Sequence, residues 1–184
     1  MKNEAAAGGR YSLGAIALHW AIALLIGLNF AAAWVAEDAP RAEAQQIMAN
    51  HKAIGITVLV LSLLRLLWRL MHKAPPLLES LKPWEAATAK VVHWLFYVLL
   101  IALPLAGWAM HLTETGGMPV RWFGLFDIPG LPIAKDKHLG ETFSDMHSFL
   151  ATLMLVLAGL HVLASLKHVF IDRDGTMRRI LPWG

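Results

Sequence analysis

Two histidines near the end of the chain, His147 and His161, are separated by 14 residues. In an α-helix this spacing is close to four turns, so both side chains lie on nearly one face, about 21 Å apart along the axis. The segment around them is strongly apolar, and an imidazole buried there without a partner costs about 2–7 kcal/mol. Neutral imidazole is a common metal ligand. The spacing therefore favours bound metal centres at two depths.

The composition indicates which structural elements hold these histidines in place. Hydrophobic residues make up 57% of the 184, and charged residues only 16%, below the roughly 25% of a soluble domain. Four apolar stretches reach the length of about 20 residues that a helix needs to cross a bilayer. We predict an all-α, four-helix transmembrane bundle, a single membrane-integral domain over residues 1–184. Its spans are expected at residues 12–36, 53–71, 88–112 and 143–170.

Lysine and arginine set the expected orientation. The side that holds both termini and the second connection carries 11 basic and 5 acidic residues, whereas the opposite side carries 5 basic and 8 acidic. Both termini are therefore expected in the cytoplasm. The loops at 37–50 and 113–142 lie outside, and the Gly- and Pro-containing second loop is expected to cap the outer face. Cytoplasmic flanks explain the net charge of +3, so no nucleic-acid partner is indicated.

The first two spans offer one histidine each at matching depths. With alternating span directions, His19 lies near the inner surface with His161, and His51 lies near the outer surface with His147. The chain has no cysteine, which excludes thiolate-bound iron–sulfur clusters and covalent c-type haem. This pattern predicts four axial ligands for the iron of two non-covalent haem groups. No residue is predicted to be catalytic in its own right.

Other histidines compete for these roles. His93 and His111 also share a helix face, about 27 Å apart, but they lie nearer the two interfaces. They remain alternative ligands, and His93 is also a candidate for the surroundings of the inner haem or for a quinone contact. His168, at the cytoplasmic boundary, suits a supporting or quinone role. We expect Met154 to fill the core, and Thr142 with Asp145 to open the fourth helix.

Several motifs, in order along nearly the whole chain, resemble the bacterial cytochrome b561 family. They are Arg10-Tyr11-Ser12, Leu18-His19-Trp20, His51-Lys52 with Gly55, Leu64-Arg65-Leu66, Leu103-Pro104-Leu105, Gly107-Trp108, Leu160-His161, Lys167-His168, Ile171-Asp172-Arg173-Asp174-Gly175 and Arg178-Arg179. The resemblance implies a four-helix cytochrome of the bacterial inner membrane with two haem b groups, ligated by His19, His51, His147 and His161. It also extends to the cytochrome b subunits of hydrogenases and formate dehydrogenases.

The resemblance implies an electron-transfer function. The chain is expected to relay electrons between a periplasmic donor and ubiquinone-type quinone, and a family member acts as a superoxide:ubiquinone oxidoreductase. A superoxide donor needs positive charge outside, for which Lys52, Arg121, Lys135 and Lys137 are available. The alternatives are a haem anchor for a separate hydrogenase or dehydrogenase and, from another class, a histidine-lined proton or metal transporter. Besides lipid, a homodimer partner is compatible with a bundle this small.

Overall fold

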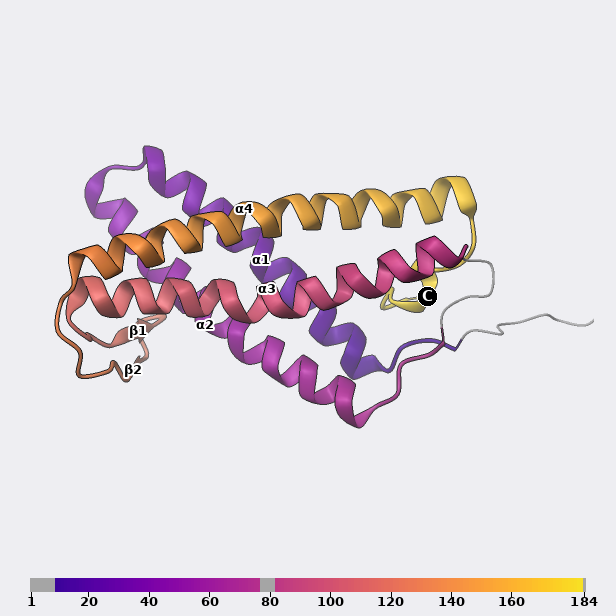
Figure 1. The fold of residues 1–184 in the computed structure, drawn as a ribbon, viewed down its shortest axis with the longest axis horizontal. Helices are drawn as coiled ribbons and strands as arrows, with labels where there is room; N and C mark the ends of the chain where they lie inside the picture. The colour runs from indigo at the N-terminus through magenta and orange to yellow at the C-terminus, as the bar shows by residue number, and fades with distance from the viewer. Residues whose placement is uncertain (1–8, 77–81, 184) are drawn as a thin grey trace, which may run out of the picture.

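The computed structural model describes residues 9–76 and 82–183. Four long helices account for most of this chain, and each is long and apolar enough to cross a membrane. The predicted all-α, four-span bundle is therefore confirmed. The helices are α1 (Leu13–Asp38), α2 (Arg41–Met71), α3 (Pro83–Thr115) and α4 (Lys137–Lys167) (Figure 1). The connection between α3 and α4 contains a hairpin of β1 (Val120–Trp122) and β2 (Phe126–Ile128) at one end of the bundle.

The helix ends follow local chemistry. The Ser12 hydroxyl accepts a hydrogen bond from the Ala15 N–H and caps α1, and Pro83 begins α3 where its missing N–H is not needed. Gly116, at a φ of 76°, ends α3 in the left-handed conformation. Helix α4 begins at the Asp136 cap and continues into a short π-helix at its end (His168–Asp172). Thr142 lies inside α4 and donates to the His138 carbonyl, so the predicted start at Thr142 is wrong.

The loops in the structure are shorter than the sequence predicted. Helix α2 already begins at Arg41, so residues 37–50 are mostly helical, because Arg41–Asn50 contains no Gly or Pro and many strong helix formers. Residues 113–142 include the end of α3, the hairpin and the start of α4. Hydropathy predicts the apolar part of each helix, whereas capping residues determine where the whole helix begins and ends.

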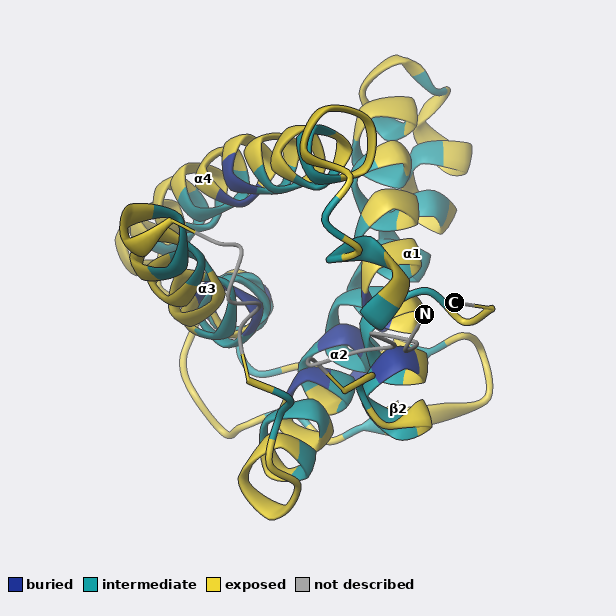
Figure 2. Ribbon diagram, turned by 90° about the vertical axis from the view of Figure 1, so that its right-hand side faces the viewer, coloured by how far each residue is buried: buried dark blue, intermediate teal, exposed yellow. Residues whose placement is uncertain are grey.

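Helix pairs pack unequally. The close backbone contacts join α1 to α2, α3 to α4 and α2 to α3. An end-on view places α3 and α4 on one side and α1 on the other, with exposed residues mostly on the outside (Figure 2). Many of these exposed side chains are large and apolar, as the surface of a helix bundle in lipid requires.

The tightest packing lies midway along the bundle. Its fully buried members include Met154, only 1% exposed, which confirms the prediction that this residue fills the core. The other members come from all four helices, namely Ile22, Val58, Leu99, Leu100 and Leu157. This core separates the two ends of the bundle.

The two ends differ in structure. At one end, here called the terminal end, the residues after α4 return to the start of α1. There the Trp20 indole donates to the Ile180 carbonyl at 2.9 Å and the Arg10 guanidinium to the Pro182 carbonyl at 2.7 Å. The opposite end, here called the hairpin end, holds the two strands. Its Trp122 indole donates to the Thr57 hydroxyl at 3.0 Å and fixes the hairpin to α2.

Candidate haem sites

The four histidines of the predicted pairs meet in two layers. Near the hairpin end, the rings of His51 on α2 and His147 on α4 have centres 6.2 Å apart. Near the terminal end, the rings of His19 on α1 and His161 on α4 have centres 6.4 Å apart. The buried core around Met154 lies between these layers.

These distances suit a shared metal. An imidazole nitrogen binds a transition metal at about 2 Å and lies about 1 Å from its ring centre, so two imidazoles on opposite sides of one ion have centres about 6 Å apart. The extensive backbone contacts of α4 with another long helix are those with α3, not with α1 or α2. In both layers, two histidines therefore face each other across a space between helices, and this space is wide enough for side chains. A flat macrocycle needs this arrangement.

The hairpin-end pair has its ring orientation fixed by the backbone. Nδ1 of His51 lies 3.2 Å from the Asn29 carbonyl, and Nδ1 of His147 lies 3.1 Å from the Leu103 carbonyl. A carbonyl can only accept, so each Nδ1 carries the proton and each Nε2 keeps a free lone pair. Metal-binding histidines are typically held in this way by a carbonyl or carboxylate.

Glycine makes room for one of these rings. A Cβ atom on Gly107 would lie 2.8 Å from Cε1 and 2.9 Å from Nδ1 of His147, too close for any real contact. The Leu103 carbonyl belongs to the same helix, α3, so this helix both holds the His147 ring and leaves space for it. Neither contact follows from spacing alone.

The terminal-end layer contains a third histidine. The ring of His93 on α3 has its centre 6.2 Å from that of His161, as near as His19, and the Phe96 ring lies 5.3 Å from His161. Distance alone therefore does not decide between His19 and His93 as the partner of His161. The other predicted rival, His111, is buried at the hairpin end, where its Nδ1 lies 3.3 Å from the Lys52 ammonium.

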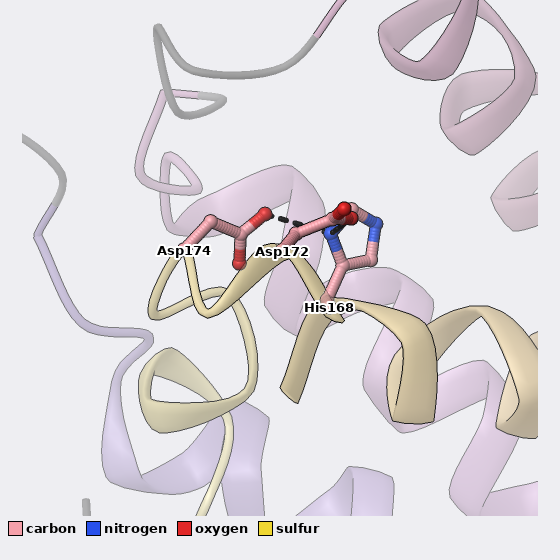
Figure 3. Close-up of side chains that lie close together, drawn as sticks. All are labelled: His168, Asp172 and Asp174. Carbon is pink, nitrogen blue, oxygen red and sulfur yellow. Dashed lines mark hydrogen bonds and ion pairs between the residues drawn. The ribbon is translucent and has the colours of Figure 1, made fainter. Parts of the chain in front are cut away.

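Beyond the terminal-end layer, His168 faces two carboxylates. Its Nδ1 lies 2.7 Å from Asp174 and 3.2 Å from Asp172, all three residues following the last turn of α4 (Figure 3). Lys167 pairs with Asp172 and with Glu85 on α3. Burial raises the pKa of Asp174, but hydrogen bonds from Thr176 and His168 outweigh it, so the pKa lies below its usual value. The cluster joins α3 to the residues after α4.

Comparison with known proteins identifies the family. Residues 10–183 match the family model described as prokaryotic cytochrome b561. The chain belongs to this family. It is 32% identical over 175 residues to "Probable superoxide oxidase CybB" of Yersinia pestis, covering 94% of this chain and 96% of that protein. It is also 30% identical over 177 residues to "Cytochrome b561 homolog 2" of Escherichia coli (strain K12), covering 94% and 91%.

Family membership settles the general activity. The chain is a multi-pass membrane cytochrome of b type that transfers electrons, and haem b is its cofactor. The resemblance seen in the sequence motifs is thereby confirmed. A histidine-lined transporter does not agree with this membership.

Proposed function

We propose that the chain binds two haem b groups and relays electrons from a donor at the hairpin end to a quinone at the terminal end. His51 and His147 would hold one haem, and His19 and His161 the other. The observation that carries the proposal is the repeated arrangement of the two layers. Each places two imidazole rings just over 6 Å apart, between helices that lack extensive backbone contact with each other.

His19 is a better partner for His161 than His93 because of helix packing. Helices α3 and α4 are in extensive contact, and the α3 side chains Val92, Phe96 and Leu103 lie against the buried core. A porphyrin between His93 and His161 would have to separate these helices. Helices α1 and α4 lack such extensive contact, and the His19–His161 pair repeats the geometry of the hairpin-end pair.

Bound haem b would supply one-electron chemistry, and the residues that would hold it, their hydrogen bonds and the surrounding burial would set its potential. If two histidines hold each haem, as proposed, its iron would have no position free for a substrate, which favours electron transfer over chemistry at the metal. The protein's own contribution is to fix the ligand rings. It does so through the Asn29 and Leu103 carbonyls at the hairpin end.

The terminal end suits a quinone, whose reduction takes two electrons and two protons. His168 follows α4 directly, at the boundary of the span, and is held through Nδ1 by Asp174 and Asp172. Because Nδ1 faces the two carboxylates, Nε2 is the ring nitrogen that is left for another partner. We assign His168 the role of proton donor to the bound quinone.

The donor and the orientation complete the proposal. The excess of Lys and Arg on the terminal side supports an orientation in the inner membrane with both termini in the cytoplasm and the hairpin end in the periplasm. The name of the Yersinia pestis relative favours superoxide as donor. In that case two superoxide anions and one quinone, with two protons, give two dioxygen molecules and one quinol.

A reconstitution experiment tests this proposal. The purified full-length chain, loaded with haem, is placed in liposomes with ubiquinone, and superoxide is generated outside. We expect haem reduction followed by quinol formation, and His168→Gln should slow quinol formation at least tenfold while haem reduction keeps its rate. His138→Gln, a change at an exposed residue of the hairpin end, is the matched control. Unchanged quinol formation in His168→Gln would overturn the proton-donor role.

One observation favours a second function, that of haem anchor for a periplasmic enzyme. The hairpin end exposes large apolar side chains outside the predicted spans, among them Leu125, Phe126 and Met118. Such a surface could receive a partner protein. Haem reduction by superoxide in the isolated chain distinguishes the functions, because an anchor subunit would depend on its partner for electrons.

A further inference from the structure

An arginine of α2 lies in the same layer as the terminal-end histidines. Arg65 follows His51 by 14 residues, the spacing that also separates His147 from His161. Because 14 residues are close to four helical turns, Arg65 lies on nearly the same face of α2 as His51, about 21 Å nearer the terminal end. Its positive charge acts on all three histidines of the terminal-end layer. The guanidinium therefore belongs to this layer.

The contacts of Arg65 hold it against α1, close to His19. A guanidinium N–H donates to the Ala15 carbonyl at 3.3 Å. In an α-helix this carbonyl also accepts from the N–H four residues later, which is that of His19. The two helices pack tightly here, since a Cβ atom on Gly14 would lie 2.5 Å from the Trp68 ring. This packing holds the guanidinium about one helical turn from His19.

The charge of Arg65 has no anion beside it. In the part of the chain that the structure describes, no carboxylate lies within ion-pair distance of its guanidinium. The carboxylates of Asp172 and Asp174 pair within the cluster around His168. Arg65 is half-buried inside a membrane span, where an unpaired charge is costly. The planar fork of N–H donors on a guanidinium matches a carboxylate.

We propose that Arg65 binds a propionate carboxylate of the haem at the terminal end. This inference rests on the proposed function, which assigns a haem to His19 and His161. Haem b carries two propionates, so it brings to this layer the carboxylate that the side chains around Arg65 do not supply. A guanidinium–carboxylate pair would offset one negative charge of the macrocycle and favour one orientation of it. A lipid phosphate shares this anion chemistry, and the second arm of the test distinguishes the two sources.

The first arm measures how firmly the terminal-end haem is held and at which potential it is reduced. The full-length protein is purified with its haem, and the haem that is lost in His161→Ala is taken as the terminal-end one. We expect Arg65→Met to speed the transfer of this haem to excess apomyoglobin about tenfold or more. Its midpoint potential should fall, because a nearby positive charge disfavours the more positive oxidised iron. The hairpin-end haem should keep both values.

Two variants serve as controls. Arg65→Lys keeps the charge without the planar fork, so it should keep most of the potential but only part of the haem retention. Arg69→Met removes the same kind of charge from the same helix, one turn later at an exposed residue, and should leave both values near those of wild type. If Arg65→Met does not fold, the comparison of Arg65→Lys with Arg69→Met still decides the outcome.

The inference is overturned if two haems are bound and neither Arg65 variant changes the terminal-end haem, or if Arg69→Met changes it equally. A protein without any haem in the terminal-end layer would contradict the proposed function as well, so the two failures differ.

The second arm identifies the anion. The same variants are loaded in detergent with the dimethyl ester of haem, whose two carboxyl groups carry no charge. If Arg65 binds a propionate, Arg65→Met should then retain this haem as well as wild type does, because the partner of the guanidinium is already gone. Equal weakening by Arg65→Met with haem and with its dimethyl ester would assign Arg65 to another anion, such as a lipid phosphate, and would overturn the inference.

Discussion

Replacing Gly107 by alanine should loosen the haem at the hairpin end and leave the other haem in place. The added methyl carbon would lie 2.8 Å from Cε1 of His147, whereas carbon atoms in contact prefer about 3.5–4.0 Å. The ring must therefore retreat by about 0.7 Å. Its Nδ1 is held by the Leu103 carbonyl of the same helix, so this movement strains the hydrogen bond that orients the ring.

The magnitude follows from two penalties. A crowded packing site costs about 1–3 kcal/mol, and a weakened hydrogen bond adds up to about 1 kcal/mol. With 1.4 kcal/mol for each factor of ten, a loss of about 2 kcal/mol weakens haem retention more than tenfold. The rate at which excess apomyoglobin removes haem from the purified protein measures this retention. We expect one rapidly lost and one slowly lost haem in Gly107→Ala.

Gly159→Ala is the matched control. A Cβ atom on Gly159 meets no neighbouring atom, and this residue lies on the opposite face of α4 from His161. Both substitutions raise helix propensity by the same amount, so only the contact with His147 differs. If Gly107→Ala releases both haems at the wild-type rate, the reasoning that α3 positions the His147 ring is refuted.

Three further outcomes are expected. Met154→Ala should destabilise the bundle by about 2–5 kcal/mol through a cavity in its core, measured as a lower unfolding temperature at unchanged haem content. Trp122→Phe removes the indole hydrogen bond to Thr57, so hydrogen exchange in the hairpin should accelerate while that of α4 does not. The lowered pKa of Asp174 stabilises the fold above about pH 4, and this contribution is lost as the pH falls through that lowered pKa. Asp174→Asn should therefore destabilise the protein at pH 7, and the difference from wild type should shrink in acid unfolding below about pH 4.

Much of the fold could be predicted from the sequence because it depends on regular features of the chain, namely apolar length and helix periodicity. Apolar length fixes the number of spans, and helix periodicity places His147 and His161 on one face. Matching depth predicted that His19 lies near His161 and His51 near His147, and the structure has both pairs of rings close together. An alternating bundle leaves little freedom along the membrane normal. The helix ends were less predictable, because Asp136 and Gly116 act through local hydrogen bonds that hydropathy does not report.

The surroundings of the histidines could not be predicted in the same way. The carbonyls of Asn29 and Leu103 carry no side-chain signal, although they orient two rings. His93 was expected nearer the interface, and its approach to His161 depends on how α3 is rotated about its axis. His111 and Lys52 lie 59 residues apart and meet only through the packing of α3 on α2.

The number and identity of the haem ligands are tested most directly by haem content and reduced-minus-oxidised spectra of purified variants. We predict two haem b groups per wild-type chain and one in each of His51→Ala and His161→Ala, with different spectra for the remaining haem. His93→Ala should keep both groups. Two haems in His51→Ala or in His161→Ala, or the loss of one in His93→Ala, would contradict the ligand assignment.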